Sequence, residues 1–174
     1  MPRPVSLEPG TRLLRLPLIQ FLQEADRWED AVVATADARR RFPDDFNLAL
    51  LHVQSLNEIG RYQESIAILD EIRVLPSEHA SMSHTLFAAA HTMAATDRIR
   101  ADPLAAATHL RTAMTWPETL GQGRPYEPEE RLQRYLLGTA LEAAGDDAAA
   151  REAWSAVVDR TPSDALDGSG GWQG

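Results

Sequence analysis

Residues 26–32 read Asp-Arg-Trp-Glu-Asp-Ala-Val, and residues 60–66 read Gly-Arg-Tyr-Gln-Glu-Ser-Ile. A third, weaker copy, Gly-Asp-Asp-Ala-Ala-Ala-Arg, occupies residues 145–151. The copies run on to a proline, at Pro43, Pro76 and Pro162. The first two copies begin 34 positions apart, which is the period of a repeat made of two helices and a turn. Such a unit buries its apolar face only by stacking on a neighbour. The pattern predicts an all-α protein, a right-handed α-solenoid of about four helix-turn-helix hairpins.

Glycine, proline and aspartate divide the chain into segments. We expect an irregular lead-in over residues 1–10, a helical repeat domain over 11–162 and a disordered tail over 163–174. Pro17 suits the first turn of a helix, so the first helix is predicted to begin there. Leu69, Leu137 and Trp154 lie on the inward stripes of their hairpins, and we expect them in the core. The predicted helices span 17–25, 28–41, 46–59, 62–75, 77–96, 103–115, 127–144 and 147–160.

The segment Trp116 to Tyr126 interrupts the period with two prolines and two glycines. Glycine allows backbone turns that other residues avoid, proline restricts them, and the two aromatic ends can bury large areas. We therefore predict an ordered loop that packs back against the third and fourth hairpins, near Glu78 and the His84–His91 face.

Composition restricts the classes of partner. The chain has 174 residues, a net charge of −9 and no cysteine. Residues 101–174 hold 12 acids against 6 arginines. Nucleic-acid backbones require clustered positive charge, and thiolate metal sites and disulfides require cysteine. No signal peptide or membrane-spanning run is visible, so the cytoplasm is the expected compartment. We expect a neutral or basic protein or peptide partner, and neither nucleic acid nor membrane.

A candidate binding groove follows from the helical register, because the first helix of each hairpin lines the concave side of such a solenoid. Residues three, four or seven positions apart share one helix face. These stripes combine polar and aromatic side chains, which suits a bound peptide; the alternative is solvated helix surface or contact with another domain. The predicted groove residues are Asn47, Leu50, Gln54, Asn57, His84, Phe87, His91, Leu132, Tyr135, Thr139 and Glu142.

Catalytic and metal chemistry find no support in the pattern. His84 and His91 lie two helical turns apart, too far to hold one metal ion together, so no metal site is predicted. The pairs Glu129-Glu130 and Asp146-Asp147 begin helices, where capping and the helix dipole explain acidic side chains. The groove offers no cation for clamping a terminal carboxylate. We expect a protein that is not an enzyme and has no cofactor.

The turn glycines, the small residues at the hairpin contacts and the repeat-ending prolines resemble the tetratricopeptide repeat. The similarity is good over residues 12–45, 46–76 and 131–162, and weaker over 77–117. Residues 74–78, 84–91 and 116–131 also resemble one bacterial tetratricopeptide family. Members of that family usually carry an uncharacterised β-sandwich domain before the repeats and are often linked to carbohydrate metabolism. This resemblance implies a helical scaffold, and it carries over no catalytic residue.

Two functions follow as hypotheses. The first is a non-catalytic protein–protein interaction scaffold that presents a concave groove to a peptide or a partner domain. The alternative is a helical accessory region of a larger carbohydrate-active protein, supporting or dimerising a β-sandwich or catalytic domain that this chain does not contain.

Overall fold

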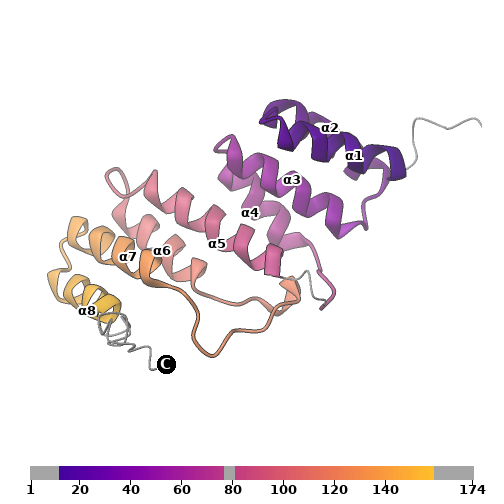
Figure 1. Ribbon diagram of the computed structural model, residues 1–174. Coiled ribbons are helices and arrows are strands. Elements are labelled where there is room, and N and C mark those ends of the chain that lie inside the picture. Colours follow the sequence, from indigo (N-terminus) through magenta and orange to yellow (C-terminus); the bar gives the residue numbers. More distant parts are fainter. Residues whose placement is uncertain (1–11, 77–80, 159–174) are drawn as a thin grey trace, which may run out of the picture. The chain divides into compact units, whose positions relative to one another are not determined.

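The computed structural model describes residues 12–76 and 81–158, and within these ranges every regular element is a helix (Figure 1). The predicted all-α class is therefore confirmed for the described residues, which contain no strand. A short 3-10 turn, η1, spans Glu118–Leu120. The α-helices are α1 Arg12–Glu24, α2 Trp28–Arg41, α3 Phe46–Glu58, α4 Tyr62–Glu71, α5 Ser81–Thr96, α6 Pro103–Ala113, α7 Arg131–Ala143 and α8 Asp147–Val158.

The three copies of the sequence repeat share one backbone feature at their first residue. Asp26, Gly60 and Gly145 have φ values of 53°, 76° and 84°, all in the left-handed region. Each of them lies in the turn between two helices, α1–α2, α3–α4 and α7–α8. Glycine reaches this conformation without steric cost, and aspartate is among the few other residues that tolerate it. The repeat in sequence is thus a repeat of turn geometry.

Aspartate side chains cap the N-terminal ends of α3 and α6. The Asp45 carboxylate accepts hydrogen bonds from the backbone N–H groups of Asn47 and Leu48 at 3.1 and 3.4 Å. Asp102 accepts from the N–H of Ala105 at 3.1 Å, and Pro103 follows it at the position that proline favours. These caps satisfy N–H groups that have no partner inside the helix.

The first and fourth helices differ from the prediction. Helix α1 begins at Arg12 and continues through Pro17, which costs one backbone hydrogen bond. Burial of Ile19 and Leu22 beyond the proline holds the helix together. Helix α4 ends at Glu71 instead of residue 75, because the backbone becomes extended at Ile72.

The start of α7 also differs from the prediction. The helix begins at Arg131 and not at residue 127, so Pro128 and Glu129 precede it. The Glu129 carboxylate accepts a hydrogen bond from the Arg131 N–H at 3.1 Å, which fixes the first turn at that point. Three predictions lie outside the described residues: the start of the fifth helix at 77–80, the end of the eighth helix at 159–160, and the tail at 163–174.

The chain divides into two compact units. Unit 1 comprises residues 1–93 and 116–124, and unit 2 comprises 94–115 and 125–174. The larger core cluster of unit 1 joins α2, α3, α4 and α5 through Val32, Val53, Leu56, Leu69 and Phe87. A smaller cluster joins α1, α2 and α3 around Ile19, Ala38 and Leu48.

Unit 2 packs α6, α7 and α8 around small side chains. Its buried residues include Ala106, Leu110, Ala140 and Ala150. A side chain at Gly138 would collide with the indole ring of Trp154, so this glycine allows α7 and α8 to approach closely.

The core prediction is confirmed for two residues and needs correction for the third. Leu69 and Leu137 are buried. Trp154 is only half-buried, because its ring lies against Gly138 near the surface of the α7–α8 pair. Its indole N–H donates a hydrogen bond to the carbonyl oxygen of Tyr135 at 3.1 Å.

Candidate functional site

The loop of unit 1 that follows α6 lies on the histidine face of α5. The rings of Trp116 and His84 are stacked, with centroids 3.3 Å apart and planes 5° from parallel. The ring centroids of His84 and Phe87 lie 6.1 Å apart, and the Phe87 ring makes an edge-on contact with the His91 ring at a centroid distance of 4.6 Å. Phe87 and His91 are buried, whereas His84 is half-buried beneath Trp116. The predicted aromatic stripe therefore exists, and the protein's own loop and core occupy it.

Backbone contacts hold the same loop in place. The Val74 N–H donates to the Thr119 carbonyl at 2.8 Å, and the Ser83 hydroxyl donates to the Leu120 carbonyl at 2.6 Å. Leu120 is only 1% exposed and belongs to the core cluster. Gly121 has φ of 70°, and a β-carbon there would lie 2.5 Å from the Val74 oxygen. Residues 116–124 are thus an integral part of unit 1.

This arrangement confirms one part of the loop prediction and corrects another. The loop packs near His84, as predicted. Tyr126 is 98% exposed and buries almost nothing, because the chain has left the loop's contacts before it reaches that residue. Glu78 lies outside the described residues, and contact with the fourth hairpin stays a prediction.

The predicted groove residues on α3 have different surroundings. Asn47 is exposed and Gln54 is half-buried. Leu50 is buried in the core cluster of unit 1, where it presents no surface to a partner. The Asn57 amide donates to the carbonyl oxygen of Leu86 on α5 at 3.2 Å. Helix α3 therefore offers two polar side chains but no apolar anchor from the predicted set.

Helix α7 presents its predicted residues together on one side. Leu132, Tyr135, Thr139 and Glu142 recur at helical spacing, and Leu132 and Tyr135 are 58% and 57% exposed. Glu142 is exposed, and Thr139 is half-buried with its hydroxyl donating to the Tyr135 carbonyl at 3.2 Å. We call these four residues the α7 face. In unit 2 this face combines an aliphatic, an aromatic and a charged side chain.

Two ion pairs neutralise the arginines of α7. Arg131 forms a forked contact with Glu129, with N–O distances of 2.6 to 3.0 Å. Arg134 pairs with the buried Glu130 at 2.7 Å. No basic residue lies in the last turn of α7, where Glu142 is located. The face is therefore apolar toward its N-terminal end and acidic toward its C-terminal end.

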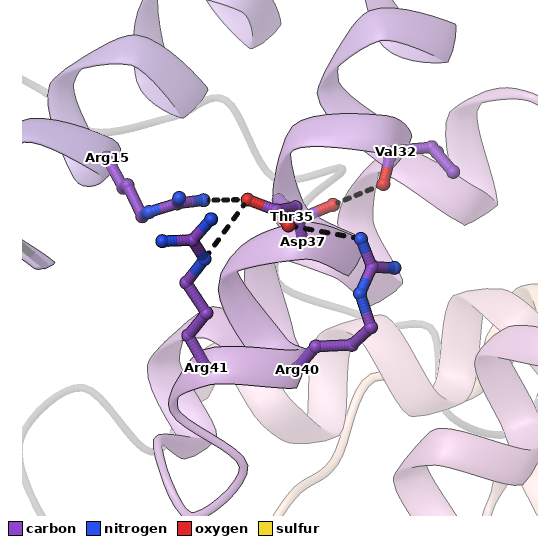
Figure 2. A network of polar contacts seen from close by, with 6 residues as sticks. All are labelled: Arg15, Val32, Thr35, Asp37, Arg40 and Arg41. Atoms are coloured by element: carbon purple, nitrogen blue, oxygen red, sulfur yellow. Dashed lines mark hydrogen bonds and ion pairs between the residues drawn. The ribbon is translucent and has the colours of Figure 1, made fainter. Parts of the chain in front are cut away.

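A cluster of charged side chains around Asp37 in unit 1 has a structural role. The Asp37 carboxylate receives Arg15 from α1 and Arg40 and Arg41 from its own helix, the last two at 3.1 and 3.6 Å (Figure 2). The hydrogen bond from Arg15 is the main cause that lowers the pKa of Asp37, and Arg41 and Arg40 add to it. A carboxylate held ionised by three guanidinium groups joins α1 to α2 (Figure 2).

The buried polar pair of Thr35 and His52 was not predicted from the sequence. His52 Nδ1 lies 2.6 Å from the hydroxyl oxygen of Thr35, and both side chains are buried between α2 and α3. Burial, with help from the charges of Arg39 and Arg61, lowers the pKa of His52 to about 4. Helical spacing alone places His52 beside the apolar residues Leu51 and Val53, but only the packing of α2 brings Thr35 to it.

Metal-binding clusters and membrane-spanning helices are absent from the described residues. Among residues 12–76 and 81–158, no group of three or more histidine, aspartate or glutamate side chains is arranged to hold a metal ion. No helix in the described part of the chain is long and apolar enough to cross a membrane.

The comparisons with known proteins found no family model, no curated protein and no solved structure that matches this chain.

Proposed function

We propose that this chain is a tetratricopeptide-like, right-handed helical scaffold that binds a protein or peptide partner and has no catalytic role or cofactor. Three hairpin turns of the same backbone geometry, at Asp26, Gly60 and Gly145, support the repeat architecture. Stacked helical hairpins of this kind create extended concave surfaces for binding.

The observation that carries the proposal is the α7 face. Isolated exposed apolar residues are common on protein surfaces, but here Leu132 and Tyr135 are neighbours on one helix, with Glu142 on the same side. Tyrosine is enriched in protein interfaces because it buries a large ring and keeps a polar tip. A helix face that combines an aromatic, an aliphatic and a polar side chain suits peptide binding.

Site-specific photo-crosslinking tests the proposal. A benzophenone amino acid replaces Tyr135, and the matched control carries it at Leu104, which is also more than half exposed, on α6 of the same unit. In cells that naturally make the protein, we expect a discrete crosslinked partner at position 135 and none at 104. The partner is then identified by mass spectrometry, and its affinity for the purified chain is measured by calorimetry.

Two results would count against the scaffold. The first is the same crosslinking pattern at both positions, because it would show that position 135 has no specific neighbour. The second is turnover of a substrate, such as a glycoside, by the purified chain, which would remove the non-catalytic part of the proposal.

A second candidate is a helical accessory region of a larger carbohydrate-active protein. It is favoured by the outer side of α1, where Leu18 and Phe21 are neighbours at helical spacing and more than half exposed. An apolar pair in this place suits contact with another domain. A transcript that extends upstream of Met1 into strand-rich sequence would support this candidate, and normal partner capture by a Leu18→Ser/Phe21→Ser variant would leave the scaffold as the better explanation.

A further inference from the structure

The α7 face is divided into two chemically different ends. Leu132 and Tyr135 lie in the first half of the helix, and Glu142 lies in its last turn. The two arginines of the helix are already engaged by Glu129 and Glu130. Among the described residues no ion pair or hydrogen bond of the Glu142 side chain is present. The acidic end is therefore available to an external cation.

Glu142 is placed against the preference of the helix itself. The C-terminal end of an α-helix carries a partial negative charge, so a carboxylate in the last turn is unfavourable and a cation is preferred there. No basic residue of α7 lies in this turn to compensate. Residues that oppose a local preference without a compensating contact are concentrated at functional sites. The position of Glu142 is thus a second observation, independent of the exposed apolar pair.

We propose that the α7 face binds a basic peptide segment of a partner protein, with an apolar side chain on Leu132 and Tyr135 and a lysine or arginine on Glu142. This inference rests on the proposed function and specifies the chemistry of its partner. An apolar anchor supplies buried area, and the charge pair supplies orientation along the helix.

The spacing along α7 limits the sequence of the peptide. Tyr135 and Glu142 are seven residues apart, which corresponds to about 10 Å along a helix. An extended peptide advances roughly 3.3 Å per residue, so its basic residue lies about three positions from its apolar anchor. A partner with the same residues in adjacent positions would not reach both ends of the face.

Charge favours this occupant over nucleic acid. The chain carries a net charge of −9, and the arginines on α7 are neutralised by neighbouring glutamates. A phosphate backbone would meet Glu142 with no free cation beside it on this helix, whereas a basic peptide meets a complementary charge. The net charge also favours encounter with a basic partner through long-range attraction.

Selection from a phage-displayed library of random short peptides, with the immobilised full chain as bait, tests the inference. We expect enriched peptides to share an aromatic or aliphatic residue about three positions from a lysine or arginine. For a synthetic peptide of that sequence, Glu142→Gln should weaken binding about tenfold, in line with the loss of one charged contact. The matched control is Glu152→Gln, an exposed glutamate on α8, which should leave the affinity unchanged.

Charge reversal gives a sharper readout than loss of affinity. Glu142→Arg should reject the basic peptide and accept the same peptide with glutamate in place of its basic residue. Tyr135→Ala should weaken both pairs, because it removes the apolar end. Circular dichroism of each variant shows that the fold is retained, as expected for exposed side chains.

The outcomes separate this inference from the proposed function. Enriched peptides that bind equally well to Glu142→Gln and Tyr135→Ala, or that are acidic, overturn the inference while a crosslinked partner at position 135 still supports the scaffold. Self-association of the chain that Tyr135→Ala abolishes also overturns it, because the face would then bind a second copy. If the selection yields no peptide, the inference fails, and the crosslinking result alone decides the proposed function.

Discussion

Helices α5 and α7 both carry a stripe of residues that the helical register assigned to a binding surface, yet their environments are opposite. On α5 the stripe His84, Phe87 and His91 is covered by Trp116 and by the core of unit 1. On α7 the corresponding stripe leaves Leu132 and Tyr135 more than half exposed in unit 2.

The difference arises from a segment that the repeat pattern does not include. Residues 116–124 interrupt the period, and their contacts with Val74 and Ser83 place Trp116 over His84. No comparable element covers the α7 face among the described residues. Spacing along a helix thus indicates which side chains share a face, whereas a neighbouring segment decides whether that face is free.

The largest effect is expected where the loop enters the core of unit 1. Leu120→Ala should lower the free energy of unfolding by about 2–5 kcal/mol, because it removes a fully buried side chain and leaves a cavity. The matched control is Leu132→Ala on the open α7 face, with a change of about 0.5 kcal/mol or less. Chemical denaturation measures both, and equal effects would contradict the contrast between a filled and a free surface.

The buried histidine of unit 1 makes stability depend on pH. The pKa of His52 is lowered from 6.5 to about 4, so the unfolded state binds a proton more readily between these values. The contribution of His52 to the free energy of unfolding is fully present above its pKa in the unfolded state. It falls as the pH drops from 6.5 toward 4, by about 3 kcal/mol at most. Denaturation midpoints measured between pH 7 and 4.5 report this loss, because most carboxylates stay ionised in that pH range.

The control for this pH dependence is His109 in unit 2. Burial and the charge of Arg98 also lower the pKa of His109, but it is only half-buried. His52→Gln should flatten the pH dependence of stability much more than His109→Gln does. A steeper loss in the His109 variant than in the His52 variant would show that the buried Thr35–His52 pair is not the cause.

The close contact of α7 with α8 predicts a smaller effect. Gly138→Ala should destabilise the protein by about 1–3 kcal/mol, because the added methyl group must displace the Trp154 ring. Gly123→Ala is the matched control, since a β-carbon at Gly123 meets no atom within 4 Å. Fluorescence of the tryptophans during denaturation reports both, and an unchanged Gly138→Ala variant would mean that Trp154 is free to move aside.

The smallest effect on stability is expected on the α7 face itself. Tyr135→Ala should change the free energy of unfolding by about 0.5 kcal/mol or less, because the side chain is mostly exposed. A loss above about 2 kcal/mol would place the ring in a packed environment and would close the face to a partner. Binding, in contrast, should depend strongly on this residue, as described for the selected peptides.

The predictions made from sequence were most successful at the hairpin turns and helix interiors. The turn glycines Gly60 and Gly145 lie between the two helices of a hairpin, where they adopt positive φ. The prediction was wrong at Pro17, which lies inside α1, and at the end of α4. The proline rule describes a local free-energy cost, which the burial of Ile19 and Leu22 offsets in α1. After α4 the extended backbone lets Val74 donate a hydrogen bond to the distant residue Thr119, which a local rule does not include.

The amino-acid sequence alone predicts the helical hairpins, their turn residues and the stripes of apolar and aromatic side chains, because these depend on backbone preference and on spacing within one helix. Tertiary contacts bury Leu50, Phe87 and His91 and place Trp116 over His84, whereas they leave Leu132 and Tyr135 exposed. Exposure depends on contacts between residues far apart in the chain, and no spacing rule contains them.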